Sequence, residues 1–335
     1  MFIPLKVRRS PCVNKTRSAV TESFLATEGA VSYMKRMNFS FFRTFPARSG
    51  PARSGPALSG PALIGAVAAM ALQLAADPAR AQQTREPGAS AWAPSPKSRA
   101  RLVSAGPLEN GIYRAGVEIA LDGNALTYWR NPGDAGVPPE FDFTGSTNLA
   151  KTEITYPAPE RHDEDGSEVF GWRRSVIFPL QIAPTDPTKP VAVTLALRYA
   201  ACEKICIPSD GRMELTFAPK AAASPQAERI AQWASLVPRP AAQADATFDL
   251  ESVVGAAKPQ WRVRISPPEA GSDLFAEGAD GWFFDTRAIA GGGFKLVLAE
   301  RPTGSANMTS IRLTLRRASG AVEFETKLDA GDVTP

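Results

Sequence analysis

The sequence predicts an all-β protein: an antiparallel β-sandwich followed by a second, smaller sandwich-like β-domain, with a short helix between them. Many segments alternate apolar and polar residues with a period of two, which is typical of half-buried strands. These segments are short and are separated by turns rich in Gly and Pro, a pattern that favours a sandwich. The 254 residues after residue 81 suit two domains of about 110–130 residues each.

Strands of the first β-domain are expected at 111–121, 173–183, 191–199 and 212–217, where β-branched and aromatic residues concentrate. The alternation is clearest in 191–199. One face of that strand carries Val191, Val193, Leu195, Leu197 and Tyr199, and the opposite face carries Ala192, Thr194, Ala196 and Arg198.

A helix is expected to join the two domains. Ser224 can cap its first turn, Pro225 suits the first helical position, and Pro238 ends it. The apolar residues between them recur at helical spacing: Ile230, Trp233, Ala234 and Val237.

The second β-domain shows the same period-two pattern in four segments. The residues expected to share one face of each strand are Trp261, Val263 and Ile265; Phe294, Leu296 and Leu298; Ile311, Leu313 and Leu315; and Val322, Phe324, Thr326 and Leu328. The glycines of 290–294 are expected to form a turn, because the Lys-Ser/Thr pair of a phosphate-binding loop does not follow them.

The N-terminal segment has the features of an export signal. A start at Met34 or Met37 would give a basic beginning, so residues 1–33 are expected to precede the true start. The apolar run 62–76 is too short for a typical membrane span, and 79–81 fits a signal-peptidase site with cleavage after Ala81. A retained membrane anchor is the alternative.

Charge separates this segment from the rest of the chain. Residues 1–81 hold eleven Lys/Arg and three Asp/Glu, which leaves 27 basic and 31 acidic residues in the remainder. A mildly acidic body argues against nucleic acid as a partner. The expected organisation is a presequence (1–81), a flexible lead-in (82–98), a first β-domain (99–222), and a linker helix with a second β-domain (223–335).

Most enzyme chemistries find no support. His162 is the single histidine and is expected in an exposed acidic loop. Neither G-x-S-x-G nor H-E-x-x-H occurs, and two cysteines with one distant histidine are too few ligands for a zinc site. No cofactor is expected.

The remaining candidate is the pair Cys202 and Cys206, the only cysteines left once a segment containing Cys12 is removed. They lie between two expected strands, in a connection or at a strand end. The spacing leaves three roles open: a structural disulfide, a redox-active pair, or a Cu(I) site to which Met213 could contribute. Lys204 would favour a thiolate and Glu203 would oppose it.

Two motifs resemble a known family. "LRYAACEKICIPSDGRMEL" is similar to the active-site segment of the periplasmic N-terminal domain of DsbD-type thiol:disulfide interchange proteins, especially the ScsB-like branch with C-x-x-x-C-x-P. "LTYWRNPGDAGVPPEFDFTGSTN", at 126–148, resembles a second stretch of that branch. The resemblance covers about residues 99–218 and continues more weakly through the second β-domain.

The resemblance implies an immunoglobulin-like sandwich with a redox-active disulfide. Cys206 would be the attacking thiolate, Cys202 the resolving one, and Pro208 would shape the exit from their loop. Segment 131–139 would lie near the pair and shield it, or serve as a structural loop. Tyr128 and Trp129 would be either core and loop anchors or partner-binding residues.

The resemblance also implies a periplasmic protein that takes electrons from a membrane-embedded thiol reductant. It would pass them to periplasmic thioredoxin-like proteins that serve isomerases or cytochrome c biogenesis. Family members continue into a membrane region, which this sequence lacks, so a stand-alone module with a separate reductant is expected. As an enzyme it would be a protein-disulfide reductase; copper binding and a structural disulfide in an interaction module remain the alternatives.

Overall fold

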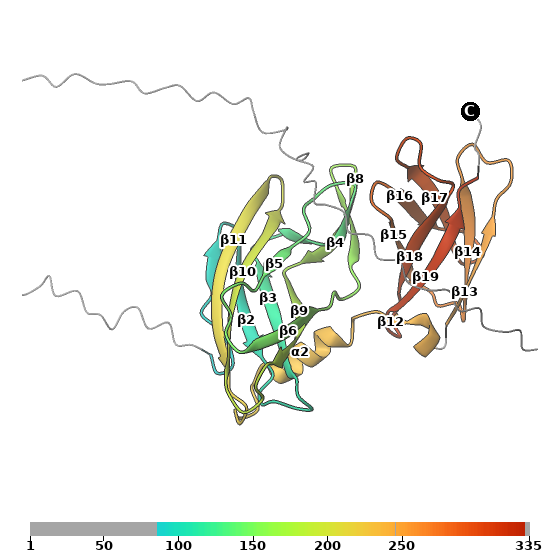
Figure 1. The fold of residues 1–335 in the computed structure, drawn as a ribbon. Coiled ribbons are helices and arrows are strands. Elements are labelled where there is room, and N and C mark those ends of the chain that lie inside the picture. The colour runs from blue at the N-terminus through green and yellow to red at the C-terminus, as the bar shows by residue number, and fades with distance from the viewer. Residues whose placement is uncertain (1–85, 245, 332–335) are drawn as a thin grey trace, which may run out of the picture. The chain divides into compact units, whose positions relative to one another are not determined.

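The first β-domain consists of two sheets that enclose one core (Figure 1). The computed structural model describes residues 86–244 and 246–331, so the predicted export signal and its predicted cleavage site lie outside the described residues. The first sheet has the order β1-β2-β3-β9-β6: β1 (Ala93–Ser95), β2 (Ser98–Ser104), β3 (Tyr113–Leu121), β9 (Ser175–Pro184) and β6 (Leu149–Ile154). The second sheet has the order β11-β10-β4-β8-β7, and β5 also pairs with β10: β11 (Cys206–Phe217), β10 (Val191–Cys202), β4 (Leu126–Gly133), β8 (Ser167–Arg173), β7 (Glu160–Glu164) and β5 (Glu140–Asp142).

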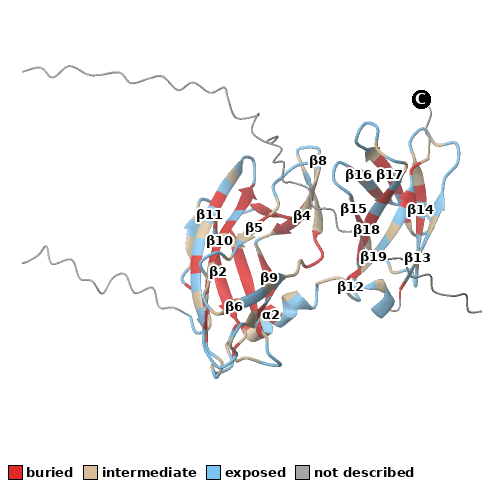
Figure 2. Cartoon of the chain, in the orientation of Figure 1, coloured by how far each residue is buried: buried red, intermediate tan, exposed pale blue. Residues whose placement is uncertain are grey.

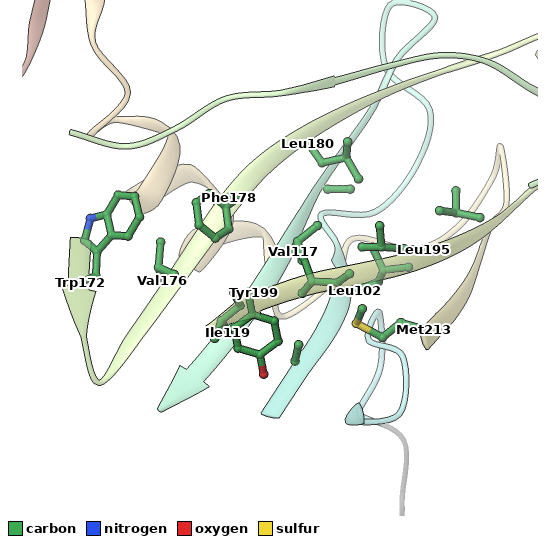
Figure 3. Close-up of a cluster of buried hydrophobic side chains, with 14 of the residues drawn as sticks. Leu102, Val117, Ile119, Trp172, Val176, Phe178, Leu180, Leu195, Tyr199 and Met213 are labelled. Atoms are coloured by element: carbon green, nitrogen blue, oxygen red, sulfur yellow. The ribbon is translucent and has the colours of Figure 1, made fainter. Parts of the chain in front are cut away.

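The predicted strand faces are confirmed in β10. Its five apolar positions from Val191 to Tyr199 are buried, whereas the residues between them are partly or fully exposed (Figure 2). The buried face packs against side chains from the opposite sheet, including Val117 and Phe178 (Figure 3). An all-β sandwich follows from this pairing of apolar faces.

The second β-domain is also built from two sheets. One has the order β12-β19-β18-β15: β12 (Arg239–Pro240), β19 (Val322–Asp329), β18 (Met308–Arg316) and β15 (Asp273–Gly278). The other has the order β13-β14-β17-β16: β13 (Thr247–Ser252), β14 (Gln260–Ser266), β17 (Phe294–Glu300) and β16 (Phe283–Ala288). The 3-10 turn η3 (Ala241–Gln243) follows β12. The 290–294 glycines form the β16–β17 turn, as the sequence predicts.

The helix α2 (Ala227–Ala234) starts later than predicted. Gln226 occupies the N-cap position, and the Ser224 hydroxyl accepts a hydrogen bond from the Gln226 amide (3.1 Å) in the turn before the helix. Ile230 is buried beside Val103 and Ile177. The helix therefore packs onto the first sheet through this face.

Two predictions about local structure are wrong. The described part of the lead-in, from residue 86 onward, belongs to the sheet: β1 pairs with β2, and Ala89 pairs with Val103. Its prolines suggested flexibility, but an edge strand tolerates proline because its outer amides need no partner. His162 lies in strand β7, opposite Val169, and its side chain is only 14% exposed.

Candidate redox site

The two cysteines face each other at the end of a long hairpin. β10 and β11 pair in one continuous register, from Val191 opposite Phe217 to Cys202 opposite Cys206. Three exposed residues, 203–205, connect the strands. The cysteines form a disulfide, with Cα atoms 4.0 Å apart. Of the two locations that the sequence left open, the structure has the pair at the strand ends, flanking the turn.

The two sulfur-bearing residues differ in exposure. Cys202 is 1% exposed and packs in a small cluster with Leu126, Tyr128, Val169 and Ala200. It also pairs with Leu126 of β4, which fixes this end of β10 inside the sheet. Cys206 begins β11, an edge strand, and is exposed. A reagent or partner protein therefore reaches the disulfide from the Cys206 side.

Tyr128 contacts the exposed half of the disulfide. Its hydroxyl lies 3.3 Å from the Cys206 sulfur and donates to it, since a disulfide sulfur carries no proton. The ring is almost fully buried, and burial, followed by the charge of Glu164, raises the pKa of the Tyr128 hydroxyl. Tyr128 therefore stays protonated at neutral pH and remains a hydrogen-bond donor.

Segment 131–139 reaches the site through this tyrosine. Gly136 has a positive φ of 116°, and a Cβ at this position would lie 2.3 Å from the Tyr128 ring. Only glycine allows so close an approach. The segment therefore packs on Tyr128, while Cys206 itself stays exposed.

The other expected site residues lie as follows. Pro208 is within β11, opposite Ala200, rather than in a loop. Glu203 pairs with Lys97 (Nζ to Oε2, 3.2 Å), which offsets part of the negative charge beside the disulfide. Lys204 is exposed in the turn. Trp129 is a core residue that packs edge-on against Phe275.

The copper site that would include Met213 is not supported. Met213 is buried in the core opposite Leu195, seven residues along β11 from Cys206. At about 3.3 Å per residue, this separation is roughly 23 Å. Among the described residues, no group of three or more His, Cys, Asp or Glu side chains is placed to hold a metal ion.

The Tyr128–Cys206 contact and the anchoring of segment 131–139 are not predicted by the sequence. Each region belongs to one of the two family motifs, but the motifs do not indicate that β4 and β11 lie on either side of β10, which brings Tyr128 close to Cys206.

Within the described part of the chain, no helix has the length and apolar character needed to cross a membrane.

Comparison with known proteins found a family match and a similar solved structure. Residues 95–218 match the family described as the N-terminal domain of the thiol:disulfide interchange protein DsbD. The crystal structure of the N-terminal periplasmic domain of ScsB from Proteus mirabilis is similar, with a TM-score of 0.60 and 16% sequence identity, over 73% of this chain and 100% of that chain. At this identity the likeness concerns the fold. No curated protein matches the chain. The Cys202–Cys206 disulfide therefore lies within residues 95–218, the part of the chain that matches the DsbD N-terminal family.

Proposed function

We propose that the chain is a periplasmic thiol–disulfide exchange protein that acts through Cys202 and Cys206. The observation that carries this proposal is the unequal exposure of the two cysteines in one disulfide: Cys206 is open to a partner, and Cys202 is buried directly opposite. A structural staple gains no function from such asymmetry. An exchange centre uses one accessible sulfur and one protected resolving thiol.

The exchange proceeds in two steps. In the reduced protein, the Cys206 thiolate attacks a disulfide sulfur of the partner, forms a mixed disulfide and releases one partner thiolate. The Cys202 thiolate then attacks the Cys206 sulfur, which re-forms the Cys202–Cys206 disulfide and releases the second partner thiolate. Two electrons pass to the partner. The reverse sequence, started by a dithiol of a reductant, reduces the protein again.

The surroundings of Cys206 suit a protein partner. Ile205, in the turn between the cysteines, is 76% exposed. Val137, which follows the Gly136 that packs on Tyr128, is 56% exposed. Exposed large apolar residues beside a reactive group are typical of transient docking surfaces. The partners in this proposal are thioredoxin-like periplasmic proteins, including those of cytochrome c biogenesis, and a separate membrane-embedded thiol reductant.

A redox titration of the full chain tests this function. The protein is equilibrated in thiol buffers of defined potential, and the fraction of reduced Cys202–Cys206 is read by alkylation and mass. An exchange centre should titrate at a midpoint above about −300 mV. A pair that stays oxidised below about −300 mV and does not react with thioredoxin-like proteins would be a structural disulfide.

A further inference from the structure

The second β-domain contacts the first at Arg130 of β4, two residues beyond Tyr128. Arg130, which follows the Tyr128–Trp129 pair in β4, donates to both carboxylate oxygens of Glu277 in β15 (2.8 and 2.7 Å) and also pairs with Glu323 in β19. All three side chains are mostly buried. A two-pronged Arg–carboxylate pair of this kind fixes orientation as well as distance.

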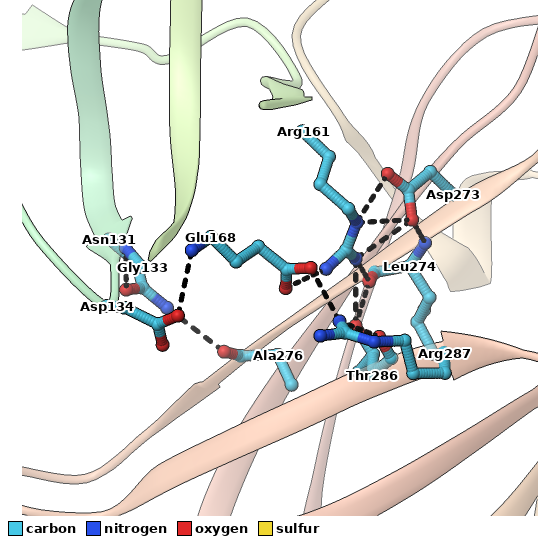
Figure 4. A network of polar contacts seen from close by, with 10 residues as sticks. All are labelled: Asn131, Gly133, Asp134, Arg161, Glu168, Asp273, Leu274, Ala276, Thr286 and Arg287. Atoms are coloured by element: carbon cyan, nitrogen blue, oxygen red, sulfur yellow. Dashed lines mark hydrogen bonds and ion pairs between the residues drawn. The ribbon is translucent and has the colours of Figure 1, made fainter. Parts of the chain in front are cut away.

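The next residue starts segment 131–139 and is also held by the second β-domain. The Asn131 side-chain amide donates to the backbone oxygen of Ala276 in β15 (3.0 Å), and its carbonyl accepts from the Gly133 amide (3.2 Å) (Figure 4). The Asp134 carboxylate then accepts from the Glu168 amide (2.9 Å), and the Asp134 amide donates to the Glu168 carbonyl (2.8 Å). The first four residues of the segment are thus fixed at both ends.

Glu168 in turn connects to the second β-domain. Its carboxylate accepts from Arg161 of β7 and from Arg287 of β16 (Figure 4). Arg161 also donates to Asp273 and to the Leu274 backbone oxygen of β15. Segment 131–139 is therefore anchored on a network that contains side chains of both β-domains.

We infer that the second β-domain positions the reactive sulfur: through Arg130 and Asn131 it fixes segment 131–139, whose Gly136 holds the Tyr128 ring so that its hydroxyl donates to Cys206. This inference rests on the proposed function, in which Cys206 is the attacking sulfur. In the reduced protein the Tyr128 hydroxyl donates to the Cys206 thiolate and stabilises it. Arg130, Asn131 and Glu277 act as positioning residues, since none of them touches either sulfur.

Other charged groups near Cys206 also act on its thiol, and none of them is changed in the variants used for the test. Glu203 and Lys204 belong to the turn, Lys97 pairs with Glu203, and Glu164 of β7 acts on the Tyr128 hydroxyl. None of them contacts the Arg130–Glu277 pair in the described structure. Changes at Glu277 or Asn131 therefore reach the thiol by contact through the segment and Tyr128, and Asn131→Ala does so without any change of charge.

The experiment measures the pKa of the Cys206 thiol from the pH dependence of its alkylation by iodoacetamide. The full chain carries Cys12→Ser and Cys202→Ser, so that Cys206 is the single thiol, and only the thiolate reacts. Tyr128→Phe should raise the Cys206 pKa by about one, because a hydrogen bond to a charged group is lost. Glu277→Gln and Asn131→Ala should raise it in the same direction by a smaller amount.

The matched control is Asp249→Asn, which removes another Arg-paired carboxylate from the second β-domain at an exposed site, and it should leave the pKa unchanged. In a Tyr128→Phe background, Glu277→Gln should have no further effect, which a general loss of stability would not produce. The inference is overturned if Glu277→Gln and Asn131→Ala leave the Cys206 pKa at the unsubstituted value, or if their effects add to that of Tyr128→Phe. No partner protein enters this measurement, so a failure of the exchange function is seen separately in the redox titration.

Discussion

Cys202 and Cys206 occupy directly opposed positions at the end of one hairpin, yet Cys202 is buried and Cys206 is exposed. The difference arises from the sheet order. β10 is an inner strand that pairs at Cys202 with Leu126 of β4, whereas β11 is an edge strand with no partner on its outer side among the described strands. Sheet topology therefore gives two residues of the same type different accessibility.

The first prediction concerns reactivity at each sulfur. In a Cys12→Ser background, Cys202→Ser leaves Cys206 as the single thiol, and Cys206→Ser leaves Cys202. The Cys206 thiol should react with an aromatic disulfide reagent at least about ten times faster than the Cys202 thiol, because the thiol of Cys202 is inaccessible. Stopped-flow absorbance at neutral pH gives both rates. Denaturant serves as the control, since unfolding should bring the two rates together. Equal rates in the native proteins would contradict the assignment.

Phe275 of β15 is expected to stabilise the contact between the two β-domains. Its ring packs edge-on against Trp129 (5.8 Å between ring centroids) and Phe170 (5.0 Å), and Arg161 lies over it (5.1 Å). Phe275→Ala should lower the free energy of unfolding by about 3–5 kcal/mol in urea denaturation. Phe283→Ala, at a position that is 55% exposed, should change it by less than about 0.5 kcal/mol. Similar effects of the two substitutions would show that Phe275 is not a core residue.

The buried carboxylate of Glu118 should be sensitive to loss of its charge. It accepts from Arg101 (Nε to Oε2, 2.7 Å), which is itself buried, and from Arg229 of α2. Glu118→Gln removes the buried counter-charge of Arg101 and leaves it only the exposed Glu86 (2.8 Å), so it should cost about 3 kcal/mol of folding free energy. Thermal and urea unfolding measure this. Glu251→Gln, in an exposed pair with Arg264, should cost at most about 1 kcal/mol.

His162 gives the protein a pH-dependent stability. Burial lowers the pKa of His162, the positive charge of Arg173 lowers it further, and Glu160 opposes both. The unfolded chain, with a histidine pKa near 6.5, therefore binds a proton at a pH where the folded protein does not. The contribution to stability is present above about pH 6.5 and is lost as the pH falls below it.

Urea unfolding at several pH values between about 7.5 and 5.5 checks this, because carboxylates with ordinary pKa values stay ionised over most of that range. The free energy of unfolding should fall with acidification in the unsubstituted protein. His162→Gln removes the single histidine, so most of that slope should disappear. An unchanged slope would mean that another group titrates.

The sequence predicted strand faces well, because a period of two assigns each side chain to one face without knowledge of the partner strand. Thus the buried face of 191–199 and the alternating strands of the second β-domain are confirmed. The pair of cysteines was found for a similar reason, since their spacing and flanking strands are local features.

The features that the sequence did not predict depend on contacts between residues far apart in the chain. His162 lies among charged residues, a composition that predicts an exposed loop. It is instead in a strand, because β7 pairs with β8 and Arg161 pairs with Asp273 of β15, more than a hundred residues away. The lead-in became part of the sheet through pairing with β2, which its own composition does not indicate. The approach of Gly136 to Tyr128 depends on the irregular pairing of β4 with β8 between Tyr128 and Gly133.

Capture of a mixed disulfide with oxidised thioredoxin tests the exchange function most directly. Reduced full chain carrying Cys12→Ser and Cys202→Ser is mixed with oxidised thioredoxin, and the product is mapped by peptide mass spectrometry without reduction. The account predicts a covalent complex joined through Cys206, which accumulates because the resolving thiol is missing, and no complex from the matching Cys206→Ser variant. A complex formed through Cys202 with equal yield, or no complex from either variant, would contradict it.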